Sequence, residues 1–299
     1  MLYGRPVTTI GTVVGRLVTW IDRLMPPGPR RDALTGELAT HFGDDDSPVT
    51  PAGCAEVERR AWTVSRHVAL IHEPASPADL PDGSSPPPEN DREPAWPPPD
   101  PADVRRRAGG VTEVRRLSDG TGLVRVDSLD AVGLAQPYLD AAFTMLRGAE
   151  RIVLDLRANG GGDPATVALI AGWLLGDTSV KLSDVVYRTH TRQWWTPDRP
   201  PGTALRQDAW VLVGPGTFSS GEALAYHLRS HGRVTVVGTT TPGAADHVLP
   251  VRLAPTVLAH VPNASVVDAV SGGNWEGSGV APDVECPPER ALDVACQLS

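Results

Sequence analysis

The stretch G-P-G-T-F-S-S-G-E-A-L-A-Y-H-L, residues 214–228, holds a serine whose surroundings allow two roles. Ser219 and Glu222 have the S-x-x-E spacing of a capping box, in which each side chain accepts a hydrogen bond from the other residue's backbone N–H. The same serine follows an apolar run and a Gly-rich turn, so it could also sit on an elbow between a strand and a helix, at the positive end of the helix dipole. The two interpretations are compatible in geometry. They differ in whether a base and an oxyanion site exist elsewhere.

A second motif offers backbone N–H groups. R-I-V-L-D-L-R-A-N-G-G-G-D, residues 151–163, is an apolar run that leads into three glycines and then into helix-forming residues. Consecutive glycines let the backbone approach a ligand closely and point its N–H groups at it. The spacing matches neither the dinucleotide-binding fingerprint nor a P-loop. The loop is therefore a tight turn or, paired with the serine elbow, an oxyanion hole with Gly161 and Ser220 as donors and Gly160 as a further candidate.

Several titratable side chains are candidate partners of the serine. An imidazole can take the serine proton and return it to a leaving amine, and a carboxylate can stabilise the charge that the imidazole gains. His67, on the stretch S-R-H-V-A-L, is either such a base or a core histidine with its bonds satisfied. His247, just past a glycine turn, is the second candidate base, and Glu222 is a secondary candidate for the site. His227 and His231, on or after the elbow helix, are expected at the surface.

The elements that would position these residues alternate in type. Short apolar runs rich in β-branched residues predict strands, and helical stretches lie between them. The expected strands are 111–117, 122–126, 151–156, 209–213 and 233–238, and the expected helices are 136–147, 164–175 and 219–230. This order predicts an α/β fold built from βα units.

The first part of the chain has a different pattern. Ile10 to Leu24 has apolar residues at intervals of three and four, as an amphipathic helix does. Residues 56–73 also read as helical. We therefore expect an N-terminal helical bundle over 1–73, a Pro-rich linker over 74–108 and an α/β core over 109–299, because prolines at that density cannot join a ladder.

Composition limits the class of protein. The 299 residues carry a formal net charge of −9, which argues against a nucleic-acid or anionic-membrane surface. The N-terminus lacks the unbroken apolar run of a signal peptide or membrane span, so a cytoplasmic protein is expected. The three cysteines, Cys54, Cys286 and Cys296, have no metal or redox spacing and read as buried thiols. No metal or cofactor is expected.

Four motifs together resemble one family. They are D-L-R-x-N-G-G-G at 155–162, T-x-S-x-x-E at 217–222, V-V-G-T-T-T-P-G at 236–243 and N-W-E-G-S-G-V-A-P-D-V-E at 274–285. In this order they resemble the C-terminal processing (tail-specific) serine peptidases. The last motif is similar, more narrowly, to the branch shared by the tricorn core protease and the interphotoreceptor retinoid-binding modules.

The resemblance implies a ClpP/crotonase-like core with Ser219 as nucleophile. Processing peptidases place a lysine base where Pro242 to Ala244 stand here, and the chain's one lysine, Lys181, lies before the serine, so a Ser–Lys dyad is excluded. The tricorn-like branch instead implies His67 as base and Glu276 as the carboxylate that orients it. Glu276 has the alternative role of pinning a C-terminal loop.

Three functions follow as hypotheses. The first is a serine peptidase that cleaves peptide or protein substrates through an acyl-enzyme, with Ser219, His67 and Glu276 as its catalytic set. The second is a catalytically idle module that binds an apolar small molecule in the same cleft, as the similarity to retinoid-binding modules allows. The third, acyl chemistry on a thioester, rests on an analogy of fold alone.

Overall fold

The computed structural model describes residues 8–73 and 96–298, and the chain divides into two compact units. Unit 1 combines residues up to Pro98 with Val186–Thr191 and Asp246–Ser265. Unit 2 comprises Pro99–Val185, Arg192–Ala245 and Val266–Ser299. Most of the predicted Pro-rich linker, residues 74–95, lies outside the described residues, and its later part contains a short helix, α4 (Pro101–Arg106).

Unit 1 packs helices against a small antiparallel sheet. Strand β10 (Val257–Asp268), whose last residues belong to unit 2, pairs with β1 (Ala69–His72) and β9 (His247–Ala254). The helices are α1 (Ile10–Leu24), α2 (Pro29–Phe42) and α3 (Pro51–Ala61). The expectation of helix over 56–73 is wrong for its second half, because helix α3 ends at Ala61. The apolar residues after it gain a ladder partner in β10, which outweighs their local helical pattern.

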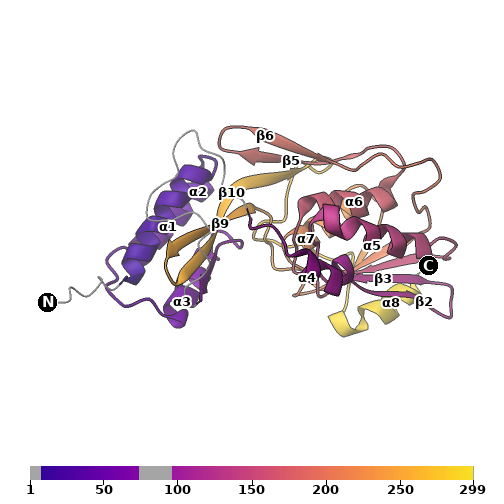
Figure 1. Ribbon diagram of the computed structural model, residues 1–299, viewed down its shortest axis with the longest axis horizontal. Coiled ribbons are helices and arrows are strands. Elements are labelled where there is room, and N and C mark those ends of the chain that lie inside the picture. Colours follow the sequence, from indigo (N-terminus) through magenta and orange to yellow (C-terminus); the bar gives the residue numbers. More distant parts are fainter. Residues whose placement is uncertain (1–7, 74–95, 299) are drawn as a thin grey trace. The chain divides into compact units, whose positions relative to one another are not determined.

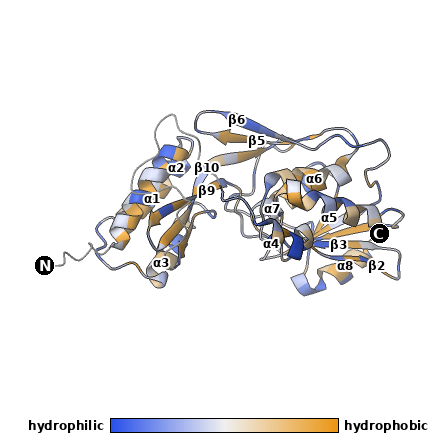
Figure 2. Ribbon diagram, in the orientation of Figure 1, coloured by the Kyte–Doolittle hydropathy of each residue, from blue (hydrophilic) through white to orange (hydrophobic). Residues whose placement is uncertain are grey.

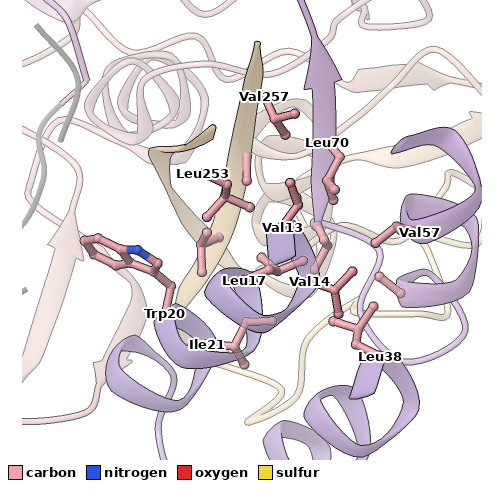
Figure 3. Packing of buried hydrophobic residues seen from close by; sticks show 14 of the residues in the cluster. Val13, Val14, Leu17, Trp20, Ile21, Leu38, Val57, Leu70, Leu253 and Val257 are labelled. Atoms are coloured by element: carbon pink, nitrogen blue, oxygen red, sulfur yellow. The ribbon is translucent and has the colours of Figure 1, made fainter. Parts of the chain in front are cut away.

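The amphipathic helix predicted from Ile10 to Leu24 is confirmed as α1. Its apolar stripe is fully buried at Val13, Leu17 and Ile21. Figure 3 shows this stripe against Leu253 of β9 and Val257 of β10, in one apolar cluster with residues of the other two helices. Because the stripe recurs every three or four residues, it lies on a single face of the helix. Burial of that face is what holds the helices of unit 1 on their sheet.

Unit 2 has the predicted α/β fold, built on a six-stranded sheet of order β11-β8-β7-β4-β3-β2. All neighbours in it are parallel except β2 and β3. The strands are β2 (Val111–Arg116), β3 (Gly122–Val126), β4 (Ile152–Asp155), β7 (Ala209–Val213), β8 (Thr235–Gly238) and β11 (Val284–Glu285). The five strands expected from the sequence are thus confirmed: two have the expected bounds, and the ends of the other three differ by at most two residues.

Helices cover both faces of this sheet, as Figure 1 shows. On one face lie α5 (Val132–Met145), α6 (Pro164–Leu175) and α7 (Ser220–Ser230), and on the other lies α8 (Ala291–Gln297). Trp210 and Leu212 of β7 pack in a cluster with Ala291 and Ala295 of α8. Helix α6 is apolar along almost its whole length in Figure 2 and is buried from Thr166 to Leu174. Strands covered on both faces read as continuous apolar runs, which is why the sequence revealed them.

Two further strands, β5 (Lys181–Tyr187) and β6 (Thr191–Trp195), are neighbours in a sheet and were not expected from the sequence. Their side chains are mostly polar or half-exposed, so the apolar pattern that marks a buried strand is missing. Single 3₁₀ turns lie at Ala108–Gly110 and Pro288–Arg290. Within residues 8–73 and 96–298, no helix has the length and apolar character needed to cross a bilayer.

The packing of α1 predicts a large effect of one substitution. Leu17→Ala removes a fully buried side chain from the centre of the stripe and should lower the free energy of unfolding of unit 1 by about 2–5 kcal/mol. Thr19→Ala, on the exposed side of the same helix, should stay within about 0.5 kcal/mol of the parent. Denaturant unfolding followed by circular dichroism measures both. Equal losses in the two variants would contradict the packing described.

Candidate active site

Ser219 stands on a sharp elbow between strand β7 and helix α7. The turn is fixed from below by Thr217, whose hydroxyl donates to the Leu156 carbonyl at 2.8 Å and accepts from the Gly214 N–H at 3.0 Å. Ser219 itself has φ 53° and ψ −121°, in the half of backbone space that favours glycine. A non-glycine residue held there stores roughly 1–3 kcal/mol of strain, which persists only when its surroundings impose it. The elbow expected from the sequence is therefore present, half-buried and strained.

The capping box is confirmed as well, since Ser219 is the N-cap of α7 and Glu222 occupies the third helical position. The Glu222 carboxylate accepts the Ser219 N–H at 2.9 Å. Cap and elbow thus coexist at one residue, as the sequence allowed. The carboxylate in the first turn also complements the positive end of the helix dipole.

Glu222 does more than cap the helix. Its Oε1 accepts from the Thr241 hydroxyl at 2.5 Å and from the Gly243 N–H at 2.7 Å, and its Oε2 accepts from the Ala244 N–H at 2.9 Å. The side chain is completely buried, and burial raises the pKa of Glu222 while the four hydrogen bonds oppose that rise. The loop after β8, residues 241–244, is therefore hydrogen-bonded directly to the first turn of α7.

The glycine loop lies against the elbow because β4 and β7 are adjacent parallel strands, whose carboxyl ends meet at one edge of the sheet. Gly161 has φ 95°, and a Cβ on it would lie 2.8 Å from the Ser219 Cβ and 3.1 Å from the Ser220 nitrogen. The Ser220 hydroxyl donates to the Gly162 carbonyl at 2.8 Å. The structure thus brings together Ser219, Ser220 and Gly161, which the sequence named separately.

Asn159 determines how this loop is folded, and sequence reasoning missed it. Its side chain is fully buried, donates to the Val126 carbonyl at 2.8 Å and accepts the Gly161 N–H at 2.9 Å. The Gly161 donor is therefore engaged within the loop in this conformation. The exposed Gly160 has a long bond from its N–H to the Asp127 carbonyl, at 3.3 Å. An asparagine directly before three glycines was the available signal, since its side chain readily bonds the backbone two residues on.

Glu276 also bonds the loop after β8, which Glu222 bonds at Gly243 and Ala244. Its carboxylate accepts the Ala245 N–H at 2.7 Å. The neighbouring Trp275 indole donates to the Ala244 carbonyl at 3.2 Å, and the Gly277 N–H donates to the Gly243 carbonyl at 2.8 Å. Glu276 therefore has the loop-pinning contact that the sequence left open as its alternative role, and its carboxylate is half-buried.

His67 belongs to unit 1 and lies between α3 and β1, with its ring buried. Its Nδ1 is hydrogen-bonded to the Asp246 carbonyl oxygen. Because a carbonyl only accepts, this bond places the proton on Nδ1, so Nε2 is the ring nitrogen that carries the lone pair. Burial lowers the pKa of His67 to about 4, against the opposing effect of the Asp246 bond, so the ring is neutral at pH 7.

Three other histidines were named from the sequence: the candidate base His247, and His227 and His231, which were expected at the surface. His247 is half-buried, with Nδ1 3.3 Å from the Tyr187 hydroxyl. His227 was expected at the surface and is instead buried, with Nδ1 2.8 Å from Asp268 Oδ2. Burial disfavours the Asp268 carboxylate, but the His227 bond and those from Ser271 outweigh it and hold the pKa of Asp268 well below its usual range. His231 is half-buried, with Nε2 3.2 Å from a backbone carbonyl.

The cysteines differ in part from expectation. Cys54 is buried, whereas Cys286 and Cys296 are half-buried, and none forms a disulfide. Cys286 directly follows strand β11, and Cys296 lies in the last turn of helix α8. Among residues 8–73 and 96–298, no group of three or more histidine, cysteine or carboxylate side chains is arranged to hold a metal ion.

Comparison with known proteins shows the family of the chain. Residues 120–286, more than half of the chain, match the model of peptidase family S41. A crystal structure from Parabacteroides merdae, of a protein assigned as a peptidase, is similar with a TM-score of 0.65 and 17% identity, covering 97% of this chain and 96% of that one. A lipoprotein from Streptococcus agalactiae is similar with a TM-score of 0.58 and 13% identity over 99% and 98%. At such identities the two structures support the fold alone.

The Glu222 contacts predict that a substitution that keeps the size of the side chain will still lower stability strongly. Glu222→Gln replaces one accepting oxygen by an NH₂ group that faces backbone donors, so buried N–H groups lose their acceptor. The free energy of unfolding should fall by about 2–4 kcal/mol. Glu289→Gln, at an exposed glutamate of unit 2, is the matched control and should change it by less than about 0.5 kcal/mol. Thermal melts of both variants provide the measurement, and a Glu222→Gln variant as stable as its control would contradict the role assigned to the carboxylate.

Proposed function

Because the chain belongs to peptidase family S41, we propose that it is a serine peptidase that hydrolyses peptide bonds through an acyl-enzyme on Ser219. The observation that carries this assignment is the backbone of Ser219, at φ 53° on a strand-to-helix elbow. A serine that served only as a cap would have the extended backbone usual at that position, as Thr9 and Thr50 do at their helices. Strain at a serine elbow is the arrangement that presents a hydroxyl for attack.

The proposed base is His67. Its Nδ1 proton is committed to the Asp246 carbonyl, so Nε2 is the atom that would take the Ser219 proton and later return it to the leaving amine. A neutral, buried imidazole is the form that can accept a proton at pH 7. Glu276 is the proposed carboxylate of the catalytic set, and its bond to the Ala245 N–H fixes its position. Because the Nδ1 proton of His67 goes to the Asp246 carbonyl, Glu276 would not orient the ring through Nδ1, and its proposed role is to stabilise the positive charge that the imidazole gains.

The proposed oxyanion donors are the Ser220 N–H, at the start of α7, and an N–H of the glycine loop. Both would be aimed at an oxygen that becomes negative as the peptide carbonyl is attacked, and the helix dipole adds to this stabilisation. Since the Gly161 N–H is bonded to Asn159, its use as a donor requires that bond to be released when substrate binds.

The substrate class is peptides or proteins, as membership of a peptidase family implies. We keep the cytoplasm as the proposed compartment, because three cysteines without a disulfide are compatible with a reducing environment. The core is proposed to be of the ClpP/crotonase type, and a module that only binds an apolar molecule is the alternative that remains if Ser219 proves inert.

Substitution of the catalytic set should abolish activity without unfolding the chain. Ser219→Ala should lose more than about a thousandfold in rate and at most about 2 kcal/mol of stability from the cap. His67→Ala should lose nearly as much activity, because members of a catalytic unit fail together. Ser278→Ala, at an exposed serine of unit 2, is the matched control and should remain fully active.

Mass spectrometry of a peptide mixture incubated with each variant measures these losses, with thermal melts alongside. Loss of activity in His247→Ala with His67→Ala active would move the base to His247 and leave the peptidase intact. Parent-like cleavage by a folded Ser219→Ala variant would overturn the peptidase assignment, and a parent without cleavage would favour the binding module.

The buried His67 predicts an unusual dependence on pH. Since its pKa is lowered from 6.5 to about 4, the base stays neutral through mildly acid solution, and the initial rate should fall only as pH drops through about 4. Between about 6.5 and 4 the unfolded chain binds a proton that the folded chain does not, so this group makes stability decrease as pH falls across that window. Rates and melts at half-unit pH steps test both. An acid limb near 6.5 would contradict a buried base.

A further inference from the structure

Two segments of unit 1 contact the side chain of Asp246, the residue just before strand β9: the start of α2, through Arg30, and the segment between α3 and β1, through Ser65. Its carboxylate is almost completely buried, with 1% of the side chain exposed. Arg30, at the start of α2, donates to both of its oxygens at 2.6 and 2.5 Å. The Ser65 hydroxyl lies 3.5 Å from Oδ2, and Arg30 also reaches the Ser265 hydroxyl at 3.3 Å. A buried carboxylate with this partner has one well-defined position.

The backbone of the same residue holds the imidazole of His67. The Asp246 carbonyl accepts the Nδ1 proton, and this contact selects the tautomer and the direction of Nε2. In many serine hydrolases a carboxylate accepts the Nδ1 proton and orients the imidazole directly. Here the Asp246 carboxylate bonds Arg30, and the Asp246 carbonyl bonds His67. The orientation of the ring therefore depends on how firmly Asp246 is held.

We propose that Arg30 is a positioning residue for His67 and acts through Asp246. This inference rests on the proposed function, in which His67 is the base. The ion pair fixes the Asp246 side chain, the fixed side chain sets the direction of its own carbonyl, and the carbonyl orients the imidazole. Arg30 lies outside residues 120–286, so the helices of unit 1 acquire a part in catalysis that the family match does not cover.

A catalytic base whose position is not fixed lowers the reaction rate. Without Arg30 the Asp246 carboxylate is buried and has lost its cation, so it is driven to turn toward water. The peptide that carries the carbonyl turns with it, and the imidazole follows. A displacement of about 1 Å at a reacting group can cost on the order of a hundredfold in rate.

The test measures the rate at which a fluorophosphonate probe labels Ser219, because labelling needs the activated hydroxyl but no known substrate. Arg30→Gln should lower this rate by roughly ten- to a hundredfold. Arg30→Lys keeps the charge but loses the planar fork, so it should restore part of the rate and also serves if the Gln variant folds poorly. Arg31→Gln is the matched control in the same helical turn, where Arg31 pairs with the exposed Asp22 and Asp32.

A double-substitution cycle separates positioning from general stability. If Arg30 acts through His67, then Arg30→Gln should have no further effect in a His67→Ala background, whereas a structural role would lower both rates alike. The acid limb of the labelling rate should also move to higher pH in Arg30→Gln, because an Asp246 carboxylate whose charge Arg30 no longer neutralises favours imidazolium. The other groups that act on His67, His247 and His260, stay unchanged and cannot cause that movement.

The outcomes distinguish the positioning role of Arg30 from the proposed function of Ser219 and His67. Full labelling of folded Arg30→Gln, or equal losses with and without His67, would overturn the positioning role while Ser219 keeps its function. Parent-like labelling of His67→Ala would remove His67 as the base, and the role of Arg30 would fall with it. A loss of rate in Arg31→Gln as large as in Arg30→Gln would also contradict the proposal, since it would trace the effect to the helix as a whole.

Discussion

The buried carboxylate of Glu222 is the interaction on which the site in unit 2 depends. It accepts four donors from two segments, the Ser219 N–H on one side and Thr241, Gly243 and Ala244 on the other. Each of these donors would be costly to leave unpaired in the interior. The first turn of α7 and the loop after β8 must therefore fold together, and the strained backbone of Ser219 is stabilised by bonds that exist only in that arrangement.

The same loop is held from the C-terminal side of unit 2. Trp275, Glu276 and Gly277 contact the three successive residues Gly243, Ala244 and Ala245 through a side-chain donor, a carboxylate and a backbone N–H. Trp275 in turn packs edge-on against His227, with ring centroids 5.7 Å apart. The sequence motifs that carry the family resemblance are thus consecutive parts of one bonded network, which explains why they occur together in this chain.

Much of unit 2 could be predicted because its strands are buried on both faces. Runs such as 122–126 and 209–213 are apolar throughout and bounded by turn residues, and the structure has strands with those bounds. Helix α6 begins and ends where its proline and glycine place it. The strained serine, its capping glutamate and the glycine loop could also be identified, because each lies at the end of a strand that the pattern revealed.

What the sequence could not show depends on partners far along the chain. Residues 69–72 have a helical pattern and become strand β1 because β10 lies beside them. His227 has the sequence context of a surface residue, but it is buried and hydrogen-bonded to Asp268, 41 positions later. The ion pair between Arg30 and Asp246 joins positions 216 apart, so no local spacing in the sequence predicts it. Local periodicity predicts elements, whereas buried charge pairs are decided by topology.

The most direct test of the central claim is to locate the residue that a fluorophosphonate modifies. The parent protein should be labelled at pH 7, digested and mapped by mass spectrometry. The account predicts a single adduct on the peptide that contains Ser219, with no adduct on the neighbouring Ser220. A protein that is folded and remains unlabelled, or an adduct on any serine other than Ser219, would contradict the account.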